Sequence, residues 1–369
     1  MLVLNEDQRM LMESARGVVA ASSPVSAFRK LRAPESGPGF SPEFWTEIAG
    51  LGWTGVLIPE AHGGIGFGAV GAGLIARELA RSLALSPFLA SSVLAASALV
   101  RGGADALKRE WLPAIASGKA IVALAVDEEA KANAVYQTRA VRAGGGWRLG
   151  GVKHFVLDGQ AAEALLVAAR DEEGVASLYL VRADAPSVQR DTRVLMDGRR
   201  VASVRFDGVE IGREAKLEGG AGTIDATLDI GRAVLAASLC GVAEEAFRRT
   251  LDYLKQRRQF DRTIGSFQAL QHRAAKMHID IENAWSASLK ALEAIDAGAP
   301  ASAFEVAVAK AKAGETAETA TAECLQMHGG VGMTDEYDIG LYLKRARVEA
   351  TLLGDSAYHA DRVATMLGY

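Results

Sequence analysis

The chain has 369 residues, of which 49% are hydrophobic and 23% are charged, and its formal net charge is −4. This length exceeds the usual size of a single hydrophobic core, so we expect two or three domains. The mildly acidic balance and the lack of a basic cluster in the sequence argue against a nucleic-acid partner and against binding to an anionic membrane surface.

The start of the chain and its cysteines indicate a cytoplasmic protein. The first residues, MLVLNEDQRMLMESARG, are amphipathic and charged and lack the apolar core of a signal peptide. No stretch approaches the roughly 18 uninterrupted apolar residues of a membrane span. Cys240 and Cys324 lie in apolar, helix-like sequence and are predicted to be reduced core thiols. We therefore expect no disulfide framework, no metal site and no membrane segment.

The first third of the chain is predicted to be helical. Asn5, with Gln8 three residues later, resembles a helix-start box. Residues 24–42 contain four prolines and are predicted to form a loop, after which a second helix starts at Pro42. Residues 69–117 alternate apolar and polar side chains at a helical period.

The middle of the chain changes to strand signals. From Ile121 to about Gly212, short runs rich in Val, Leu and Ala are separated by Gly and Asp turns. From about Gly219 onward the pattern is helical again, and these long, alanine-rich helices are typical of a packed bundle. The predicted helices of this last part span 223–256, 263–297, 301–328 and 340–367. Helices, then strands, then helices predict an α+β protein.

One stretch, QRRQFDRTIGSFQALQHRAAKMHIDI at 256–281, combines an apolar helix face with a polar cluster in front of it. The apolar stripe alone indicates only core packing. The pair Arg257 and Arg258 stands at the mouth of the predicted helix, where guanidinium groups suit a pyrophosphate. The apolar stripe consists of Ile264, Phe267, Leu270, Ala274, Met277 and Ile281.

The segment from Arg257 to Met277 resembles the signature of the acyl-CoA dehydrogenases, flavoproteins that desaturate acyl-CoA thioesters. PEAHGGIGFG at 59–68 and QMHGGVGMTDEY at 326–337 also occur in the family's order, so the resemblance covers essentially the whole chain. It implies an acyl-CoA dehydrogenase-like fold assembled as a homo-oligomer, or as a heterotetramer with a related subunit. The implied domains are an N-terminal helical domain at 1–118, a middle β-barrel or sandwich domain at 119–216, and a C-terminal four-helix bundle at 217–369.

The resemblance implies an FAD cofactor whose phosphates are held by matching residues of two motifs. The second motif, QxxGG, meets FAD that in the family is held mainly by a neighbouring subunit. Glycine there lets a backbone approach the phosphates closely, although two glycines taken alone indicate a helix-ending turn. The matching residues are Arg257, Gln259, Phe260, Gln268, Gln326, Gly329 and Gly330.

At the flavin-ring end the sequence departs from the family. The family's Thr-Glu-Pro and Gly-Ser-Asp are replaced by ALAVDEEAKANAV at 123–135. Phe155 keeps the family's aromatic position, but Leu157 replaces the threonine whose hydroxyl meets the ring. Backbone N–H groups can still hold the ring, so Phe155 is included among the predicted FAD-binding residues.

The catalytic base departs further. The family's glutamate, which takes the proton next to the thioester carbonyl, is replaced by Leu353 in TLLGDSAYH. A minority of the family carries its glutamate before an arginine, and here that dipeptide is Gly231-Arg232. The retained Arg232 predicts a preserved CoA pocket and a contact to substrate.

Other carboxylates remain as candidates for the base. Asp355, two residues after the replaced glutamate, is the first candidate, and its alternative role is to cap a helix. Glu349 and Asp229 are the next candidates. The adjacent Glu244 and Glu245 fall on a helical face and are predicted to be solvated.

Two functional hypotheses follow. In the first, the chain is a flavin-dependent acyl-CoA dehydrogenase, or a subunit of one, that oxidises an acyl-CoA thioester to the 2,3-enoyl-CoA. It then resembles subunits of heteromeric enzymes, several of which act on steroid or other bulky thioesters in lipid catabolism. In the second, it is a non-catalytic partner subunit that serves assembly or acyl-CoA binding. The acyl group cannot be read from the sequence.

Overall fold

The computed structural model describes residues 4–33, 37–129 and 135–369. These residues form two compact units, which we call the helical unit and the sheet unit. The helical unit consists of the chain up to Arg29, Gly73–Ala84 and Arg232–Tyr369. The sheet unit consists of Lys30–Ala72 and Leu85–Gly231. The order of helices, strands and helices along the chain confirms the predicted α+β class.

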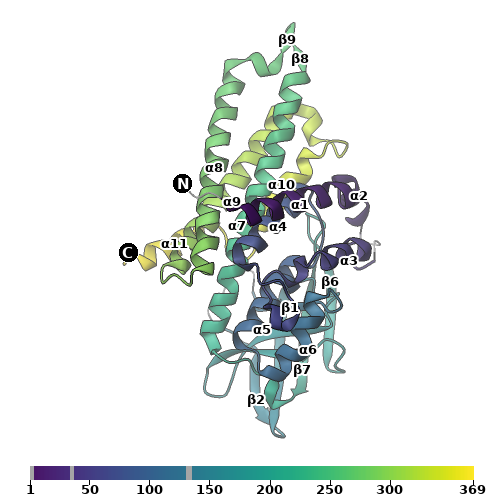
Figure 1. The fold of residues 1–369 in the computed structure, drawn as a ribbon, viewed down its shortest axis with the longest axis vertical. Helices are drawn as coiled ribbons and strands as arrows, with labels where there is room; N and C mark the ends of the chain where they lie inside the picture. Colours follow the sequence, from purple (N-terminus) through teal and green to yellow (C-terminus); the bar gives the residue numbers. More distant parts are fainter. Residues whose placement is uncertain (1–3, 34–36, 130–134) are drawn as a thin grey trace. The chain divides into compact units, whose positions relative to one another are not determined.

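The helical unit is built from long, alanine-rich helices. Its central helix, α9 (Ser302–His328), packs against α8 (Gln268–Asp296), α10 (Ile339–Thr351) and α11 (Ser356–Met366) (Figure 1). The buried face of α9 contains many small side chains, which allow neighbouring helices to approach closely. Helix α7 (Gly220–Gln256) precedes α8 in the chain and connects to it through a short hairpin, β8–β9.

α7 is the one helix among the described residues that is long and apolar enough to cross a membrane by length and composition. Within the structure, 83% of its most apolar window is buried. That burial is typical of a core helix, whose apolar surface is covered by protein.

The N-terminal helices show one correct and one wrong prediction. α1 (Glu6–Ser22) begins with the predicted box, because Asn5 and Gln8 each accept the other's backbone N–H at 2.9 Å. The predicted loop at 24–42 is wrong in part, since α2 (Val25–Leu31) lies inside it. Val25 and Phe28, three residues apart, are both buried, and burial of this pair stabilises a short helix that the prolines obscure. α3 (Pro42–Gly50) begins at Pro42 as predicted.

The remaining helices of the first third follow the predicted helical period. A π-helical segment, Phe88–Ala95, which is buried except at Leu89, leads directly into α5. The helices in this stretch are α4 (Gly68–Arg81), α5 (Ala96–Gly102) and α6 (Asp105–Ala116).

The strands of the sheet unit form one sheet in the order β1-β4-β2-β3-β7-β6, with β5 paired to the other edge of β4. The β1–β4 pair is parallel, and β3–β7, β6–β7 and β4–β5 are antiparallel. The strands are β1 (Val122–Ala125), β2 (Arg139–Ala143), β3 (Gly146–Leu157), β4 (Ala164–Arg170), β5 (Ala176–Arg182), β6 (Val188–Val194) and β7 (Arg200–Ile211).

The sequence pattern does not predict β6. Its residues, VQRDTRV, are almost all exposed because the strand lies at the sheet edge. An edge strand with both faces in water has no need for the alternation of apolar and polar residues that identifies a strand. β4, by contrast, is buried along nearly its whole length and has the apolar run that predicts it.

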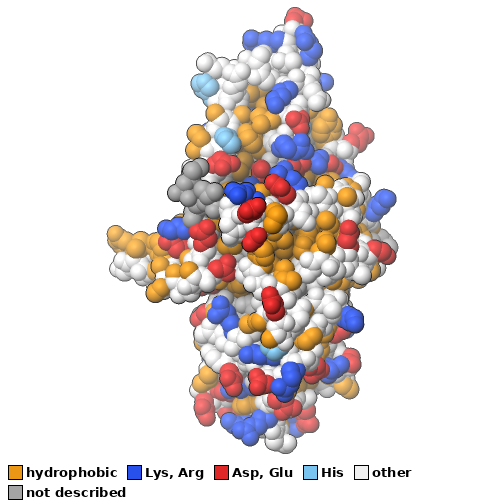
Figure 2. Space-filling model, in the orientation of Figure 1, with side chains coloured by type: hydrophobic (Ala, Val, Ile, Leu, Met, Phe, Trp, Pro, Cys, Tyr) orange, Lys and Arg blue, Asp and Glu red, His pale blue; other side chains and the backbone are white. Residues whose placement is uncertain are grey.

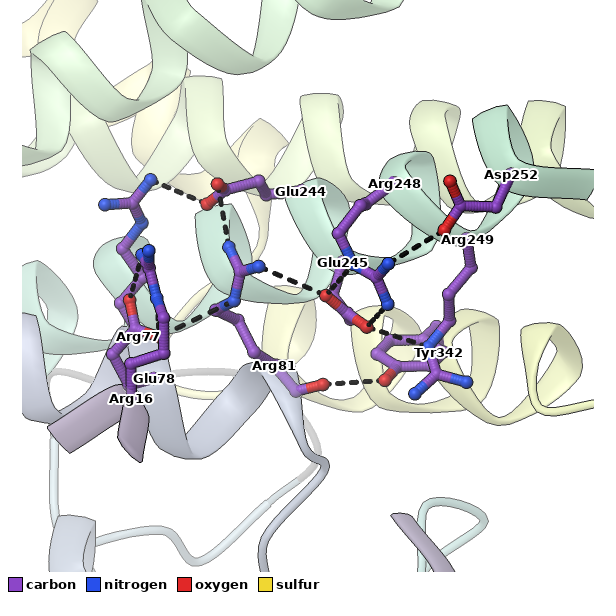
Figure 3. Close-up of polar contacts among 10 residues, drawn as sticks. All are labelled: Arg16, Arg77, Glu78, Arg81, Glu244, Glu245, Arg248, Arg249, Asp252 and Tyr342. Carbon is purple, nitrogen blue, oxygen red and sulfur yellow. Dashed lines mark hydrogen bonds and ion pairs between the residues drawn. The ribbon is translucent and has the colours of Figure 1, made fainter. Parts of the chain in front are cut away.

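A network of ion pairs connects four helices of the helical unit (Figure 3). Glu78 of α4 receives two hydrogen bonds of 3.1 Å from Arg16 of α1. Glu245 of α7 is only 6% exposed and accepts from Arg81, Arg248 and Arg249 at 2.7 to 3.2 Å. The predicted solvation of Glu245 is therefore wrong: burial is tolerated because three guanidinium groups compensate one carboxylate.

The same network extends to α10 and to the neighbouring glutamate. Glu244 is partly exposed and pairs with Arg77 at 2.6 Å and with Arg81 at 2.7 Å. Tyr342 of α10 donates its hydroxyl to the backbone carbonyl of Arg81 at 2.6 Å. Ion pairs and hydrogen bonds therefore connect α1, α4, α7 and α10 in one network.

Candidate functional site

The hairpin between α7 and α8 carries the first group of predicted FAD-binding residues. Its strands, β8 (Arg258–Gln259) and β9 (Arg262–Thr263), are joined by Phe260 and Asp261, whose φ angles are 54° and 60°. Two positive φ angles define a turn that usually contains glycine or asparagine. A bulky residue in this conformation is strained, and such strain suggests a functional constraint.

The hairpin presents positive charge and one aromatic ring to the surface. Figure 2 shows Lys and Arg side chains gathered around this end of the helical unit. Arg257, Arg258 and Arg262 are exposed. Phe260 is 84% exposed and meets Phe267 edge to face, with ring centroids 6.0 Å apart. Arg262 lies 3.9 Å above the Phe267 ring, and Arg258 donates to Asp261 O at 3.0 Å.

Arg257 differs from Arg258 and Arg262 in its contacts. Its backbone N–H donates to Tyr253 O at 2.8 Å and ends α7. Its guanidinium makes no hydrogen bond or ion pair to any residue of the described ranges. Gln259 and Gln268 are also exposed, and Gln268 is the first residue of α8. The structure therefore brings four of the predicted residues to one exposed end of the helical unit.

A pocket of about 330 Å³ opens at the same end of α7. Tyr253 and His328 stack with ring centroids 4.4 Å apart, and the edge of Tyr337 meets both rings at 6.1 and 5.8 Å. The walls therefore offer flat aromatic surfaces. The pocket is lined by Arg249, Asp252, Tyr253, Gln256, His328, Glu336, Tyr337, Asp338 and Ile339.

His328 is neutral in this pocket. Burial lowers the pKa of its imidazole. Nδ1 lies 2.8 Å from Cys324 O, a carbonyl that can only accept, so the ring proton is on Nδ1 and Nε2 carries a free lone pair. Sequence analysis did not identify Tyr253, His328 or Tyr337 as site residues. The available signal was their position, just before Arg257 and inside QMHGGVGMTDEY.

The second predicted motif follows directly after His328. Gln326 is exposed in the last turn of α9, and Gly329 ends that helix with φ 65° and ψ −147°, a conformation open only to glycine. A Cβ atom placed on Gly330 would meet no atom of the described residues within 4 Å. Packing within this chain therefore does not require glycine at position 330, and the open backbone can accept a close approach from outside.

Phe155, in the sheet unit, is turned outward by an irregular strand. The β3–β7 register shifts between Lys153 and Val156, which marks a bulge, and Phe155 has φ 52° and is 47% exposed. A bulge of this kind redirects a side chain out of the sheet pattern. Of the stretch at 123–135 that departs from the family, residues 130–134 lie outside the described residues.

A buried ion pair supports this bulge. Lys153 is fully buried and donates to Val126 O at 3.1 Å and to Glu128 Oε1 at 2.7 Å. Burial lowers the pKa of Lys153 to about 8. For Glu128, burial acts to raise the pKa, but hydrogen bonds from Lys153 and from Thr138 outweigh it and bring the pKa to about 2. Both groups are therefore charged at neutral pH, and each compensates the other.

The predicted base position lies in a break between two helices. The single helix predicted over 340–367 is wrong, because α10 ends at Thr351 and α11 begins at Ser356. Leu353 has φ 58° and Gly354 has φ 104°, and neither angle fits a right-handed helix. Asp355 caps α11, since its Oδ1 accepts Tyr358 N–H at 2.8 Å. The alternative role given to Asp355 is therefore present, and its role as a base stays a prediction.

The other candidate carboxylates lie in different surroundings. Glu349 is fully buried in α10, 3.8 Å from Arg345, while Asp229 is half-buried on α7. Arg232 is only 5% exposed and donates through Nε to Leu353 O at 3.0 Å. The structure therefore places Arg232 against the backbone of Leu353, the position of the family's glutamate. The contact of Arg232 to substrate stays a prediction.

Two further residues at this segment were missed by sequence analysis. Lys310 donates to Ala350 O at 2.8 Å and to Gly354 O at 2.9 Å, and His359 Nε2–H donates to Leu353 O at 3.1 Å. The signal for Lys310 was its position on the apolar face of α9, between Val306 and Ala313 at helical spacing.

Comparison with known proteins identifies the family of this chain. The family model described as the acyl-CoA dehydrogenase C-terminal domain matches residues 218–368, and the model of the N-terminal domain matches residues 5–119. The chain therefore belongs to the acyl-CoA dehydrogenase family, whose members are oxidoreductases acting on CH–CH bonds of acyl-CoA. The fold and the class of enzyme predicted from the sequence are confirmed.

Two curated relatives cover most of this chain. Acyl-CoA dehydrogenase FadE12 of Mycobacterium tuberculosis is 32% identical over 327 residues, which cover 83% of this chain and 82% of the relative. The 3-sulfinopropanoyl-CoA desulfinase of Paraburkholderia xenovorans is 30% identical over 100% of this chain and 98% of its own.

Two similar solved structures are complexes of two different chains. A variant of the Tcur3481–Tcur3483 steroid ACAD has a TM-score of 0.90 and 30% identity, covering 98% of each chain. The ChsE4–ChsE5 complex from Mycobacterium tuberculosis has a TM-score of 0.90 and 28% identity, covering 99% of this chain and 98% of the other.

Proposed function

We propose that this chain is one subunit of a heteromeric, flavin-dependent acyl-CoA dehydrogenase of the cytoplasm. In this proposal it binds FAD together with a related chain, and the partner chain supplies the catalytic base. The observation that carries the proposal is the β8–β9 hairpin, a strained and exposed segment with an arginine that has no partner within the described residues.

The hairpin contributes little to the stability of its own chain. Each non-glycine residue in the left-handed conformation costs about 1 kcal/mol or more, and the exposed Phe260 ring recovers little of that by burial. In our proposal these residues instead bind a group outside the chain. Arg257 can hold the pyrophosphate of FAD by charge-assisted hydrogen bonds, and Phe260 can cover an apolar part of the cofactor or of a partner chain.

The neighbouring pocket suits the adenine half of the cofactor. Its volume of about 330 Å³ and its aromatic walls fit a flat ring, and His328 Nε2 offers an acceptor. Gln326 and the open backbone at Gly329 and Gly330 lie beside it, where phosphates can approach closely. Phe155 is available to meet the flavin ring. When bound, FAD supplies the acceptor for the hydride from the substrate's β-carbon.

Position 353 and two of the three candidate carboxylates of this chain do not suit proton abstraction. Leu353 cannot accept a proton, Asp355 is used as a helix cap, and Glu349 is fully buried. We therefore assign the base to the partner chain. Two similar structures, the Tcur3481–Tcur3483 steroid ACAD and the ChsE4–ChsE5 complex, support a pair of different chains, and the first supports a steroid thioester as the substrate class.

The test is the visible absorbance spectrum of the purified protein, alone and co-expressed with a related chain that retains the glutamate. We expect flavin bands only from the co-expressed assembly, because each chain then completes the other's site. Arg257→Gln should reduce flavin content by about tenfold or more, since a charged pyrophosphate contact is lost. Lys276→Gln, which removes an exposed charge from α8, is the matched control and should retain flavin.

The other outcomes contradict the proposal. Flavin bound by the chain alone would mean that its own residues suffice for the cofactor. A colourless assembly would leave the second hypothesis, in which the chain is a non-catalytic partner that serves assembly or acyl-CoA binding.

A further inference from the structure

The segment from the last turn of α10 to the cap of α11, residues 350–355, is held by its backbone carbonyls. Three donors reach it from three different helices: Arg232 from α7, Lys310 from α9 and His359 from α11. Arg232 and His359 both donate to Leu353 O, at 3.0 and 3.1 Å. Lys310 connects the carbonyls on either side, Ala350 O and Gly354 O, at 2.8 and 2.9 Å.

These donors are buried, which is expensive for cations. Lys310 and His359 are fully buried, and Arg232 is 5% exposed. Burial lowers the pKa of Lys310 to about 7. Burial, and then the charges of Arg232 and Lys310, lower the pKa of His359 to about 3, so that its ring is neutral and donates through Nε2–H. An apolar side chain would fill the same space at lower cost, so packing does not explain these residues.

The hydrogen bonds fix an unusual backbone. Ala350 O is one of the last carbonyls of α10, which have no partner within the helix, and Lys310 satisfies it. Leu353 is a left-handed residue without the freedom of glycine. At Gly354 a Cβ atom would lie 2.3 Å from Tyr358 Cδ1 and 2.9 Å from His359 Nε2, so this glycine allows His359 to reach the segment.

Every one of these contacts involves the backbone of residue 353 or its neighbours, and none uses the side chain of Leu353, which stays half-buried. The hydrogen bonds that hold this backbone therefore do not require leucine at position 353. In the family this position carries the base, according to the resemblance of TLLGDSAYH.

We propose that Arg232, Lys310 and His359 are positioning residues that fix the backbone at 353, so that this chain has lost the base but has kept the support that aims it. The inference rests on the proposed function for what lies in front of residue 353. A carboxylate at 353 would take the proton from the substrate's α-carbon, while the hydride leaves the β-carbon for the bound flavin and the C=C bond forms.

The first experiment needs neither flavin nor substrate. Amide hydrogen exchange is measured by mass spectrometry on peptides covering 350–356 of the full chain. Lys310→Met should accelerate exchange there by about tenfold or more and leave α8 unchanged. The matched control is Lys312→Met, two residues away on α9, whose side chain is 35% exposed and pairs with Asp280 at 3.5 Å. It should change nothing in this segment.

A pair of histidine variants tests the hydrogen bond itself. His359→Leu should accelerate exchange of 350–356, whereas His359→Gln should not, because its amide N–H can reach Leu353 O. This pair decides the question even where Lys310→Met fails to fold. Unchanged exchange in His359→Leu, or equal acceleration in the leucine and glutamine variants, would overturn the positioning role.

The second experiment tests whether the support still aims a base. Leu353→Glu is co-expressed with a partner chain whose own glutamate is replaced by glutamine, and flavin reduction is followed after anaerobic mixing. The probe is an acyl-CoA that the unmodified assembly oxidises. We expect Leu353→Glu to raise the rate of flavin reduction about a hundredfold above that of the assembly without either glutamate. About a hundredfold is the usual contribution of a general base. Adding His359→Leu should remove most of that gain, and adding His359→Gln should keep it.

The two proposals fail in different ways. An unmodified assembly without flavin contradicts the proposed function, and the exchange data still decide the positioning role. The second failure is a flavin-loaded assembly in which Leu353→Glu gives no flavin reduction, although hydrogen exchange of 350–356 is the same as in the unmodified chain. That result would show that the segment is fixed but does not aim a base, and it would overturn the proposal.

Discussion

The hairpin at 258–263 and the segment at 350–355 both contain left-handed, non-glycine residues, yet their surroundings are opposite. Phe260 and Asp261 are exposed and are supported by few contacts within the chain. Leu353 is fixed by buried donors from three helices. The hairpin keeps the family's residues, whereas the segment has lost the family's glutamate.

The two regions illustrate two different reasons why a sequence retains a residue. The backbone at 350–355 is required by internal packing, so its conformation survives the loss of the reactive side chain. The side chains of the hairpin make few contacts, mostly within the hairpin and to Phe267, so in our proposal a group outside the chain accounts for them. A protein that had lost all function would keep the first kind of residue and not the second.

Among the variants that test this difference, we expect the one at Gly354 to have the largest effect on stability. Gly354→Ala places a methyl group 2.3 Å from Tyr358 Cδ1 at φ 104°, so it should lower the free energy of unfolding by about 3 kcal/mol. Gly298→Ala, at φ 59° with no atom of the described residues within 4 Å, separates conformational strain from the clash and should cost only about 1 kcal/mol. Urea denaturation measures both, and equal effects would contradict a tightly closed segment.

A smaller effect is expected in the pH dependence of stability. The pKa of Lys310 is lowered to about 7 in the folded chain, from an ordinary value of 10.5. Between these values the unfolded chain binds more protons than the folded one, so the free energy of unfolding should rise with pH.

We expect Lys310 to contribute a rise of about 2 to 3 kcal/mol between pH 7 and pH 9.5, and Lys310→Met to abolish that part of it. Denaturation curves across this range measure the rise. Lys312→Met, the exposed control, should keep the wild-type slope, and a Lys310→Met curve parallel to wild type would contradict a buried, weakly basic Lys310.

The smallest expected effect has the opposite sign and concerns the hairpin. Phe260→Asn should raise the free energy of unfolding by about 0.5 kcal/mol, because asparagine tolerates the left-handed conformation better than phenylalanine. The same variant should weaken flavin retention in the co-expressed assembly. Thermal denaturation of the chain alone and flavin absorbance of the assembly measure the two effects. A loss of stability in the chain alone would mean that Phe260 serves its own fold.

The sequence by itself determined the order of the elements and the identity of the family. Periodicity of 3.6 or 2 residues reports which face of a helix or strand is buried, and the box at Asn5 and Gln8 is a local contact that needs no tertiary structure. The predicted phosphate-binding motif is contiguous from Arg257 to Gln268, so its residues necessarily lie together.

Tertiary structure alone decided what happens at 350–359 and at Glu245. Lys310 and Lys312 stand two residues apart in the same alanine-rich helix, and only the packing of α10 and α11 against α9 makes one fully buried and leaves the other partly exposed. Arg248 and Arg249 are local partners of Glu245 in α7, but its contact with Arg81 of α4 depends on tertiary packing. The break at Leu353 depends on donors that are distant in sequence, and no local pattern encodes hydrogen bonds from residues 232 and 310.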